Sequence, residues 1–217
     1  MRRLPCFASL LTEVDGVVAQ IALGLKAHSG WAALVALAEE HGELVVVERQ
    51  RVELIESADA HWSKQPYHAA AKLELNEAEK LIRHYTAKTK LLARQRLRSV
   101  IVELRKKGCE VRGCGVLQGS GRSLPPLEKI LASHPLLHTA EGVLYREVLA
   151  HAGEHCKIAV TQVRERELFM QGAEKLRISA DELGRRLTEM GKPLGPPWGQ
   201  DEKYATLVAW LALAGDL

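Results

Sequence analysis

The chain has 217 residues and a formal net charge of +3, and 47% of its residues are hydrophobic. This length and apolar content suit one domain with its own core, so we expect a single domain over 1–217. No run approaches the ~18 uncharged apolar residues of a membrane span, and the apolar run 4–11 is too short for a secretory signal. Four scattered cysteines indicate reduced thiols rather than a disulfide scaffold. We therefore expect a cytoplasmic protein without a membrane partner.

The first quarter of the chain is typical of an antiparallel β-meander over 14–56. The segment 14–25 is dense in Val and Ile, and its two glycines would weaken a helix. The apolar segment 31–38 is expected to be the second strand, with a helix over 30–40 as the alternative. A polar, turn-like stretch over 39–42 separates it from 43–55, whose second half alternates in polarity as a half-buried strand does.

A long helix is predicted over 73–107, ending at Gly108. From Lys80 to Lys107 it carries ten Lys or Arg and one acid, Glu103. At about 100° per residue, six of these cations fall on a stripe about 80° wide: Lys80, Arg83, Lys90, Arg94, Arg98 and Arg105. A stripe of one sign beside an apolar stripe suits binding to the phosphates of nucleic acid, and a solvated helix face is the alternative.

The remainder, 110–217, alternates strands with helices. Strands are expected over 110–118 and 157–163, and helices near 125, over 136–155, 165–176, 179–190 and 200–214. Helical crossovers between strands imply parallel pairing, whereas the meander is antiparallel. The order β-β-β-α-β-α-β-α thus predicts an α/β fold with a mixed sheet flanked by helices.

This order resembles the ribonuclease H-like fold, and within that superfamily the sequence resembles the crossover-junction (Holliday junction) resolvases. Four segments carry the resemblance: Val14-Asp15-Gly16, Thr139–Leu144, Val163–Arg166 and Gln200–Ala205. In order, they resemble the first strand with its acid, the helix packed behind the sheet, the segment leaving the last strand, and a final helix that begins with a metal-binding acid. The resemblance implies a metal-dependent nuclease that acts on nucleic acid as a homodimer.

The same resemblance implies the site residues. Asp15 and Asp201 would hold Mg²⁺ or Mn²⁺, with Glu141 as a third catalytic candidate, because two-metal hydrolysis needs carboxylates that converge on ions about 4 Å apart. The family's fourth strand normally ends near an acid, whereas here the segment 115–120 has none. The alternative is therefore a non-catalytic member of the fold that binds nucleic acid or a protein.

Two further patterns have possible chemistry. His134, His138 and Glu141 share a helical face and have side chains that bind Zn²⁺, but Pro135 is expected to leave His134 outside the helix as a cap. The alternative is that these three residues only cap the helix or lie as polar groups at the edge of the core. In the loop 119–122, backbone N–H groups and Arg122 would bind a phosphate, either of nucleic acid or of a small-molecule ester. An ordinary glycine turn is the alternative for that loop.

Overall fold

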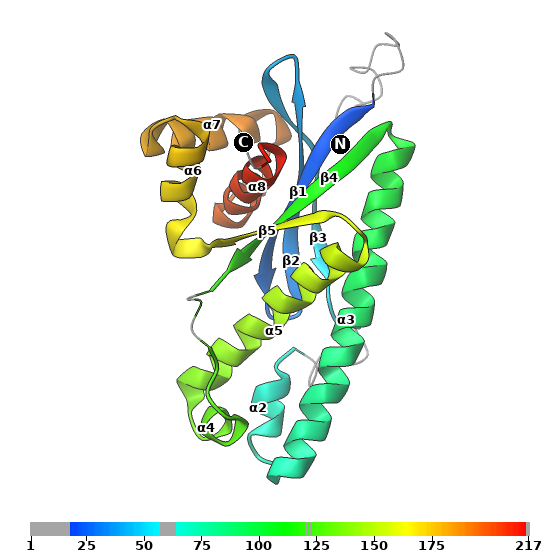
Figure 1. Ribbon diagram of the computed structural model, residues 1–217, viewed down its shortest axis with the longest axis vertical. Coiled ribbons are helices and arrows are strands. Elements are labelled where there is room, and N and C mark those ends of the chain that lie inside the picture. The colour runs from blue at the N-terminus through cyan, green and yellow to red at the C-terminus, as the bar shows by residue number, and fades with distance from the viewer. Residues whose placement is uncertain (1–17, 57–63, 120, 122, 216–217) are drawn as a thin grey trace.

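The computed structural model describes residues 18–56, 64–119, 121 and 123–215. These residues form a mixed sheet with helices on both faces (Figure 1). The strands are β1 (Ala19–His28), β2 (Trp31–Glu40), β3 (Glu43–Glu53), β4 (Cys109–Gln118) and β5 (Ala159–Arg164). The helices are α2 (Pro66–Ala70), α3 (Leu75–Lys106), α4 (Leu127–Leu131), α5 (His134–His155), α6 (Leu168–Leu176), α7 (Ala180–Gly191) and α8 (Gln200–Leu213), with short 3-10 turns η3 (Glu165–Glu167) and η4 (Lys192–Leu194). Of the helices described, none is long and apolar enough to cross a bilayer.

The sheet has the order β3-β2-β1-β4-β5. β2 lies antiparallel between β1 and β3, and β4 lies parallel between β1 and β5. This is the ribonuclease H-like mixed sheet that the order of elements predicts. The expected second strand is confirmed as β2, and the alternative of a helix over 30–40 is wrong.

The two hairpins of the meander depend on residues that accept positive φ. Gly30 closes the β1–β2 turn with φ +87°, and the β2–β3 turn has His41 at +52° and Gly42 at +82°. Two successive positive φ values form the type of hairpin turn whose twist matches that of the flanking strands. β2 is apolar over 31–38 because both of its faces are covered there, and this explains why the segment shows no alternation.

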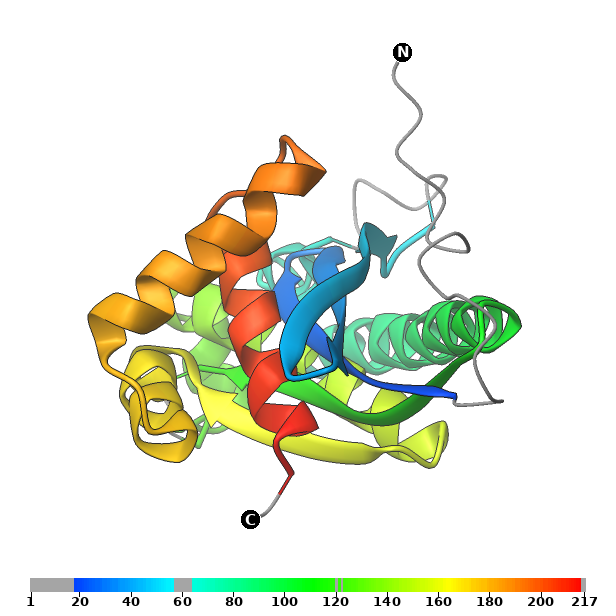
Figure 2. The same cartoon turned by 90° about the horizontal axis from the view of Figure 1, so that it is seen from above.

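Helices cover the sheet in two layers. α3 and α5 pack on one face, and α8 packs on the other with α6 and α7 beside it (Figures 1 and 2). Along β1, Ile21, Leu23 and Leu25 enter the core beneath α3 and α5. The intervening residues face α8, because successive side chains of a strand point to opposite faces.

Two glycines allow α8 to approach the sheet closely. Gly24 on β1 pairs with Gly115 on β4. A Cβ at Gly24 would lie 1.8 Å from the carbonyl oxygen of Ala205, and one at Gly115 would lie 2.3 Å from that of Val208. The backbone of α8 therefore packs directly on β1 and β4 at these two glycines, where any side chain would prevent the contact.

α2, α4 and the N-terminal half of α5 extend beyond the sheet as a smaller helical cluster (Figure 1). α5 begins at His134, with Ser133 as the N-cap residue and Pro135 in the first turn. The expectation that His134 lies outside the helix is wrong, because a first-turn proline lacks only an N–H that would have no helical partner. His134 and His138 consequently lie one turn apart on the same helix.

Candidate functional site

In open α/β sheets, ligands bind at the carboxyl ends of the strands. Here α8 begins at that edge and runs back along β1 and β4, so its first turn lies over the strand ends. β1 contains no Asp or Glu, and the polar residues of its second half are Lys26 and His28. Both lie on the same face as Gly24 and therefore point toward α8.

Lys26 is paired with an acid at this edge. Its Nζ lies 2.6 Å from Oε1 of Glu165 in η3, directly after β5. The residue is only 8% exposed, and its Nζ lies 5.1 Å from the centre of the Tyr204 ring. A nearly buried ammonium needs such a counter-charge, and the ring face adds a favourable cation–π contact.

His28 lies beside the predicted metal-binding acid. Its Nε2 is 2.9 Å from Oδ2 of Asp201 in the first turn of α8. The contact does not have hydrogen-bond alignment, so its strength depends on whether the imidazole is protonated. The His28 ring stacks on Trp31 at 4.2 Å, and the guanidinium of Arg51 lies 4.0 Å from the centre of the Trp31 ring. Asp201 thus borders a set of basic and aromatic groups.

The described residues do not fit the Mg²⁺ or Mn²⁺ pair that the resemblance implies. Glu165 and Asp201 at the strand ends each face a basic side chain, and neither belongs to a group of three or more possible metal ligands among the described residues. Gln118 ends β4, and Asp15 lies outside the described residues. Glu141 is on α5, across the sheet from α8, so the structure does not bring it together with Asp201. Two-metal chemistry needs several carboxylates at one point.

The loop after β4 approaches two arginines. A Cβ at Gly119 would lie 3.0 Å from Nη1 of Arg146, and one at Gly121 would lie 2.8 Å from Nε of Arg164. Gly121 also has φ +71°, a conformation that favours glycine. Arg122 lies outside the described residues, so its predicted phosphate contact stays a prediction.

Three imidazoles meet where α2 approaches the start of α5. One ring nitrogen from each of His68, His134 and His138 lies within 4.8 Å of the other two. The ring centres are 4.6 Å apart for His68 and His138, and 4.6 Å apart for His134 and His138. Sequence spacing identified the two residues on α5 but not His68, which lies in a different element and has no fixed spacing to them.

Glu141 lies behind this histidine cluster and is not one of its three nitrogen donors. Oε1 accepts hydrogen bonds from the backbone N–H groups of Tyr67, at 2.8 Å, and His68, at 3.3 Å, and lies 3.4 Å from Nδ1 of His68. Glu141 is 2% exposed, and Oε2 has no partner among the described residues. Burial raises the pKa of this carboxyl to about 7, although the two N–H donors oppose the shift.

A basic groove runs between α3 and the turn from α5 to β5, about 460 Å³ in volume. We call it the α3 groove; it is lined by Leu91, Arg94, Gln95, Arg98, Ile101, Val102, Arg105, His155, Cys156 and Lys157. No lining residue is acidic. Arg94, Arg98 and Arg105 form no ion pair with a described residue, whereas the neighbouring Lys106 and Lys107 are paired with acids. The groove therefore concentrates uncompensated positive charge.

The other predicted cations continue along α3 toward its N-terminus. Lys80 and Arg83 are exposed and Lys90 is half-buried. Arg83 lies 3.8 Å from Glu79, a weak surface pair. At 1.5 Å per residue, the stripe from Lys80 to Arg105 spans about 38 Å. Its C-terminal part alone forms a wall of the α3 groove.

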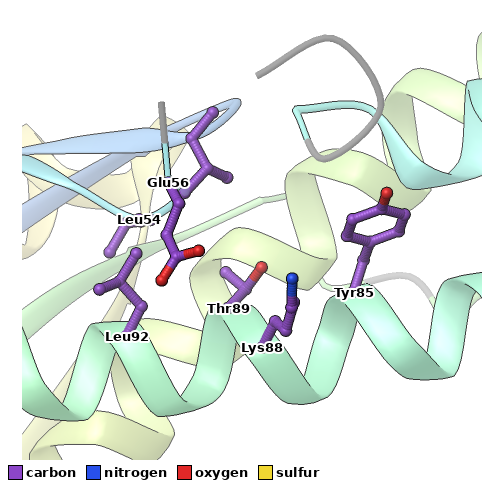
Figure 3. Close-up of a pocket in the computed structure, with 7 residues that line it drawn as sticks. Leu54, Glu56, Tyr85, Lys88, Thr89 and Leu92 are labelled. Carbon is purple, nitrogen blue, oxygen red and sulfur yellow. The ribbon is translucent and has the colours of Figure 1, made fainter. Parts of the chain in front are cut away.

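A second hollow beside α3 is too small for a substrate. It lies between α3 and the end of β3, has a volume of about 40 Å³, and is lined by Leu54, Ile55, Glu56, Tyr85, Lys88, Thr89 and Leu92 (Figure 3). A space of this size holds only a few water molecules. We therefore do not assign a ligand to it.

The solved structures that this chain is similar to include two of RuvC from Thermus thermophilus. The one in complex with a Holliday junction substrate is 9% identical, with 90% of this chain and 91% of that chain covered and a TM-score of 0.49. The other is 11% identical, with 89% and 92% covered and a TM-score of 0.49. No protein-family model and no curated protein matches the sequence. Similarity at this level carries no argument about activity, which has to come from the residues themselves.

Proposed function

We propose that this chain is a nucleic-acid-binding protein that holds a phosphate backbone in the α3 groove. One observation carries the proposal: Arg94, Arg98 and Arg105 face the groove without a described acidic partner. Guanidinium groups bind phosphate oxygens through paired N–H donors, and each neutralised phosphate releases counterions. Arg94 and Arg105 are separated by about 16 Å of helix, enough for several consecutive phosphates.

The opposite wall of the groove supports the same proposal. His155 at the end of α5 and Lys157 in the turn after it line the groove across from α3. Cations on two walls can contact a backbone from both sides, which a solvated helix face does not provide. Leu91 and Val102 are partly exposed in the groove and offer apolar contact to sugars or bases. This combination of charge and apolar surface suits sequence-independent binding of a strand.

Fluorescence anisotropy tests the proposal with labelled 20-nucleotide single-stranded DNA, duplex DNA and RNA at low salt. Arg98→Gln/Arg105→Gln removes two exposed charges from the groove, and we expect it to weaken binding at least tenfold. Arg185→Gln/Arg186→Gln is the matched control, because it removes two charges from α7 that already pair with Glu182. Equal losses in the two double variants, or no binding by the parent, would overturn the proposal.

A metal-dependent nuclease is the second candidate, favoured by the position of Asp201 at the carboxyl ends of the strands. In this proposal Asp201 and Asp15 are the acids and Mg²⁺ or Mn²⁺ the cofactor, as the resemblance implies, whereas Glu141 on α5 lies too far away across the sheet to join them. The test is cleavage of branched DNA, single-stranded DNA and RNA with each ion, comparing Asp201→Asn with Asp181→Asn on the exposed side of α7. Cleavage that only Asp201→Asn abolishes would support this candidate, and no cleavage by folded, DNA-binding protein would contradict it.

The resemblance also implies a homodimer, which sedimentation equilibrium tests.

A further inference from the structure

We infer that His68, His134 and His138 form a binding site for a transition-metal ion of the Zn²⁺ type, with Glu141 orienting His68 from behind. The site is separate from the α3 groove and from the strand ends, so it does not depend on the proposed nucleic-acid binding. Its ligands come from two elements that pack together, α2 and the first turns of α5.

The donor atoms are already close to the spacing that such an ion requires. Tetrahedral Zn²⁺ with bonds of about 2.0–2.1 Å to nitrogen places its ligand atoms about 3.3 Å apart. The three histidine nitrogens lie within 4.8 Å of one another. His134 and His138 are exposed on α5, so small rotations of their rings close the remaining distance without disturbing the core.

His68 has the environment of a metal ligand rather than of a packed core residue. Its Nδ1 faces the carboxylate of Glu141 at 3.4 Å, while its Nε2 is buried and has no hydrogen-bond partner among the described residues. A buried nitrogen left without a partner costs about 1–3 kcal/mol, and a bound metal ion would satisfy it. A carboxylate on one ring nitrogen and a metal on the other is the common arrangement at histidine metal sites.

Glu141 is itself held in place for this role. The backbone N–H groups of Tyr67 and His68 both donate to Oε1, so the carboxylate is anchored to the same helix that presents His68. The sequence pattern predicted Glu141 as a direct ligand beside His134 and His138. The geometry instead puts His68 in that position and Glu141 behind it.

The alternative is that these residues are only polar groups at the edge of the core. That alternative does not account for three imidazoles in mutual ring contact, with His68 4.6 Å from His138 and 5.5 Å from His134. It also leaves the buried Nε2 of His68 without a function. A single bound metal ion would account for both the ring contacts and the buried nitrogen.

The donor set selects the class of ion. Three imidazole nitrogens suit Zn²⁺, Cu²⁺, Ni²⁺ or Co²⁺, whereas Mg²⁺ and Mn²⁺ prefer oxygen ligands. Three ligands also leave one tetrahedral position for water or another small ligand. The ion inferred here therefore differs in class and in place from the Mg²⁺ or Mn²⁺ of a resolvase-like centre.

The experiment uses the full chain after removal of metal with EDTA and dialysis. Zn²⁺ is titrated against a chromophoric chelator, and Co²⁺ is titrated separately to record the intense visible absorption of a tetrahedral ion. We expect one high-affinity Zn²⁺ per chain and a tetrahedral Co²⁺ spectrum. The inference would be overturned if the affinity for Zn²⁺ were no higher than that of a single surface histidine, or if the Co²⁺ spectrum showed only an octahedral ion.

Variants on α5 provide a matched comparison. His138→Gln removes an exposed ligand and is expected to weaken Zn²⁺ binding at least 100-fold, whereas His155→Gln leaves it unchanged. His155 lies one turn from His151 on the same helix, at 6.3 Å between ring centres. This pair resembles that of His134 and His138 but has no third described histidine beside it, so it serves as the control. Glu141→Gln is expected to weaken binding about 10–100-fold. Equal affinities of the His138 and His155 variants would mean adventitious binding and reject the site.

Discussion

Nζ of Lys26 lies 2.6 Å from Oε1 of Glu165, joining the end of β1 to η3 across 139 residues of sequence. The pair occupies the edge of the sheet where the resemblance to resolvases implies carboxylates and metal ions. Because the Glu165 carboxylate is paired with this ammonium, the described strand ends hold an ion pair where a metal cluster would need unpaired carboxylates.

Removing the acid from this pair should destabilise the protein. Glu165→Gln leaves a nearly buried ammonium without a counter-charge, and because Glu165 is partly exposed we expect a loss of only about 1–2 kcal/mol. Adding Lys26→Met to Glu165→Gln should recover part of the lost stability, since no charge then remains to be compensated. Urea denaturation measures both, with the exposed Glu154→Gln as control. A loss no larger than that of the control would contradict the structural role of the pair.

Substitution at Gly24 should displace α8. A Cβ there would lie 1.8 Å from the carbonyl oxygen of Ala205, so backbone has to move, and we expect Gly24→Ala to cost about 3 kcal/mol. A Cβ at Gly184 in α7 would have no described atom within 4 Å apart from its chain neighbours and the nearby backbone of its own helix, so Gly184→Ala should stabilise the helix by about 0.5–1 kcal/mol. The opposite signs are measured by urea denaturation. Two changes of the same sign would refute the packing argument.

Nucleic-acid binding by the α3 groove should follow the salt dependence of phosphate contacts. For single-stranded DNA, the slope of log Kobs against log salt should become shallower by about 1.4 in Arg98→Gln/Arg105→Gln, because about 0.7 is lost per phosphate contact. Anisotropy titrations over a range of KCl concentrations give the slope, and Arg185→Gln/Arg186→Gln should retain the parent's value. An unchanged slope in the groove variant would indicate that its arginines do not contact phosphates.

Zinc should raise the melting temperature if the histidine cluster binds it. A ligand at a hundred times its dissociation constant stabilises the folded state by about 2.7 kcal/mol. For a domain of this size that is a shift of about 5–10 °C, and EDTA should reverse it. Differential scanning calorimetry should show the shift in His155→Gln and its absence in His138→Gln. A shift that persists in His138→Gln would place the bound zinc elsewhere.

Local patterns in the sequence determined much of this fold. The density of Val and Ile and the polar, turn-like stretch 39–42 predicted the meander, and the mixed sheet followed from the order of strands and helices. Helical periodicity placed Arg94, Arg98 and Arg105 on one side of α3. These predictions held because the spacing of residues within one element is fixed by the geometry of its own backbone.

Tertiary structure alone decided which residues meet across separate elements. Sheet order and register put Lys26 against Glu165 and His28 against Asp201. The packing of α2 on α5 brought His68 to the histidine pair, and the turn after α5 supplied the second wall of the α3 groove. No spacing rule links such residues, because the contacts depend on how whole elements pack and on close approaches such as that of α8 to Gly24. The sequence alone therefore predicted the elements and the stripes on their faces, and only the packing of those elements determined the sites.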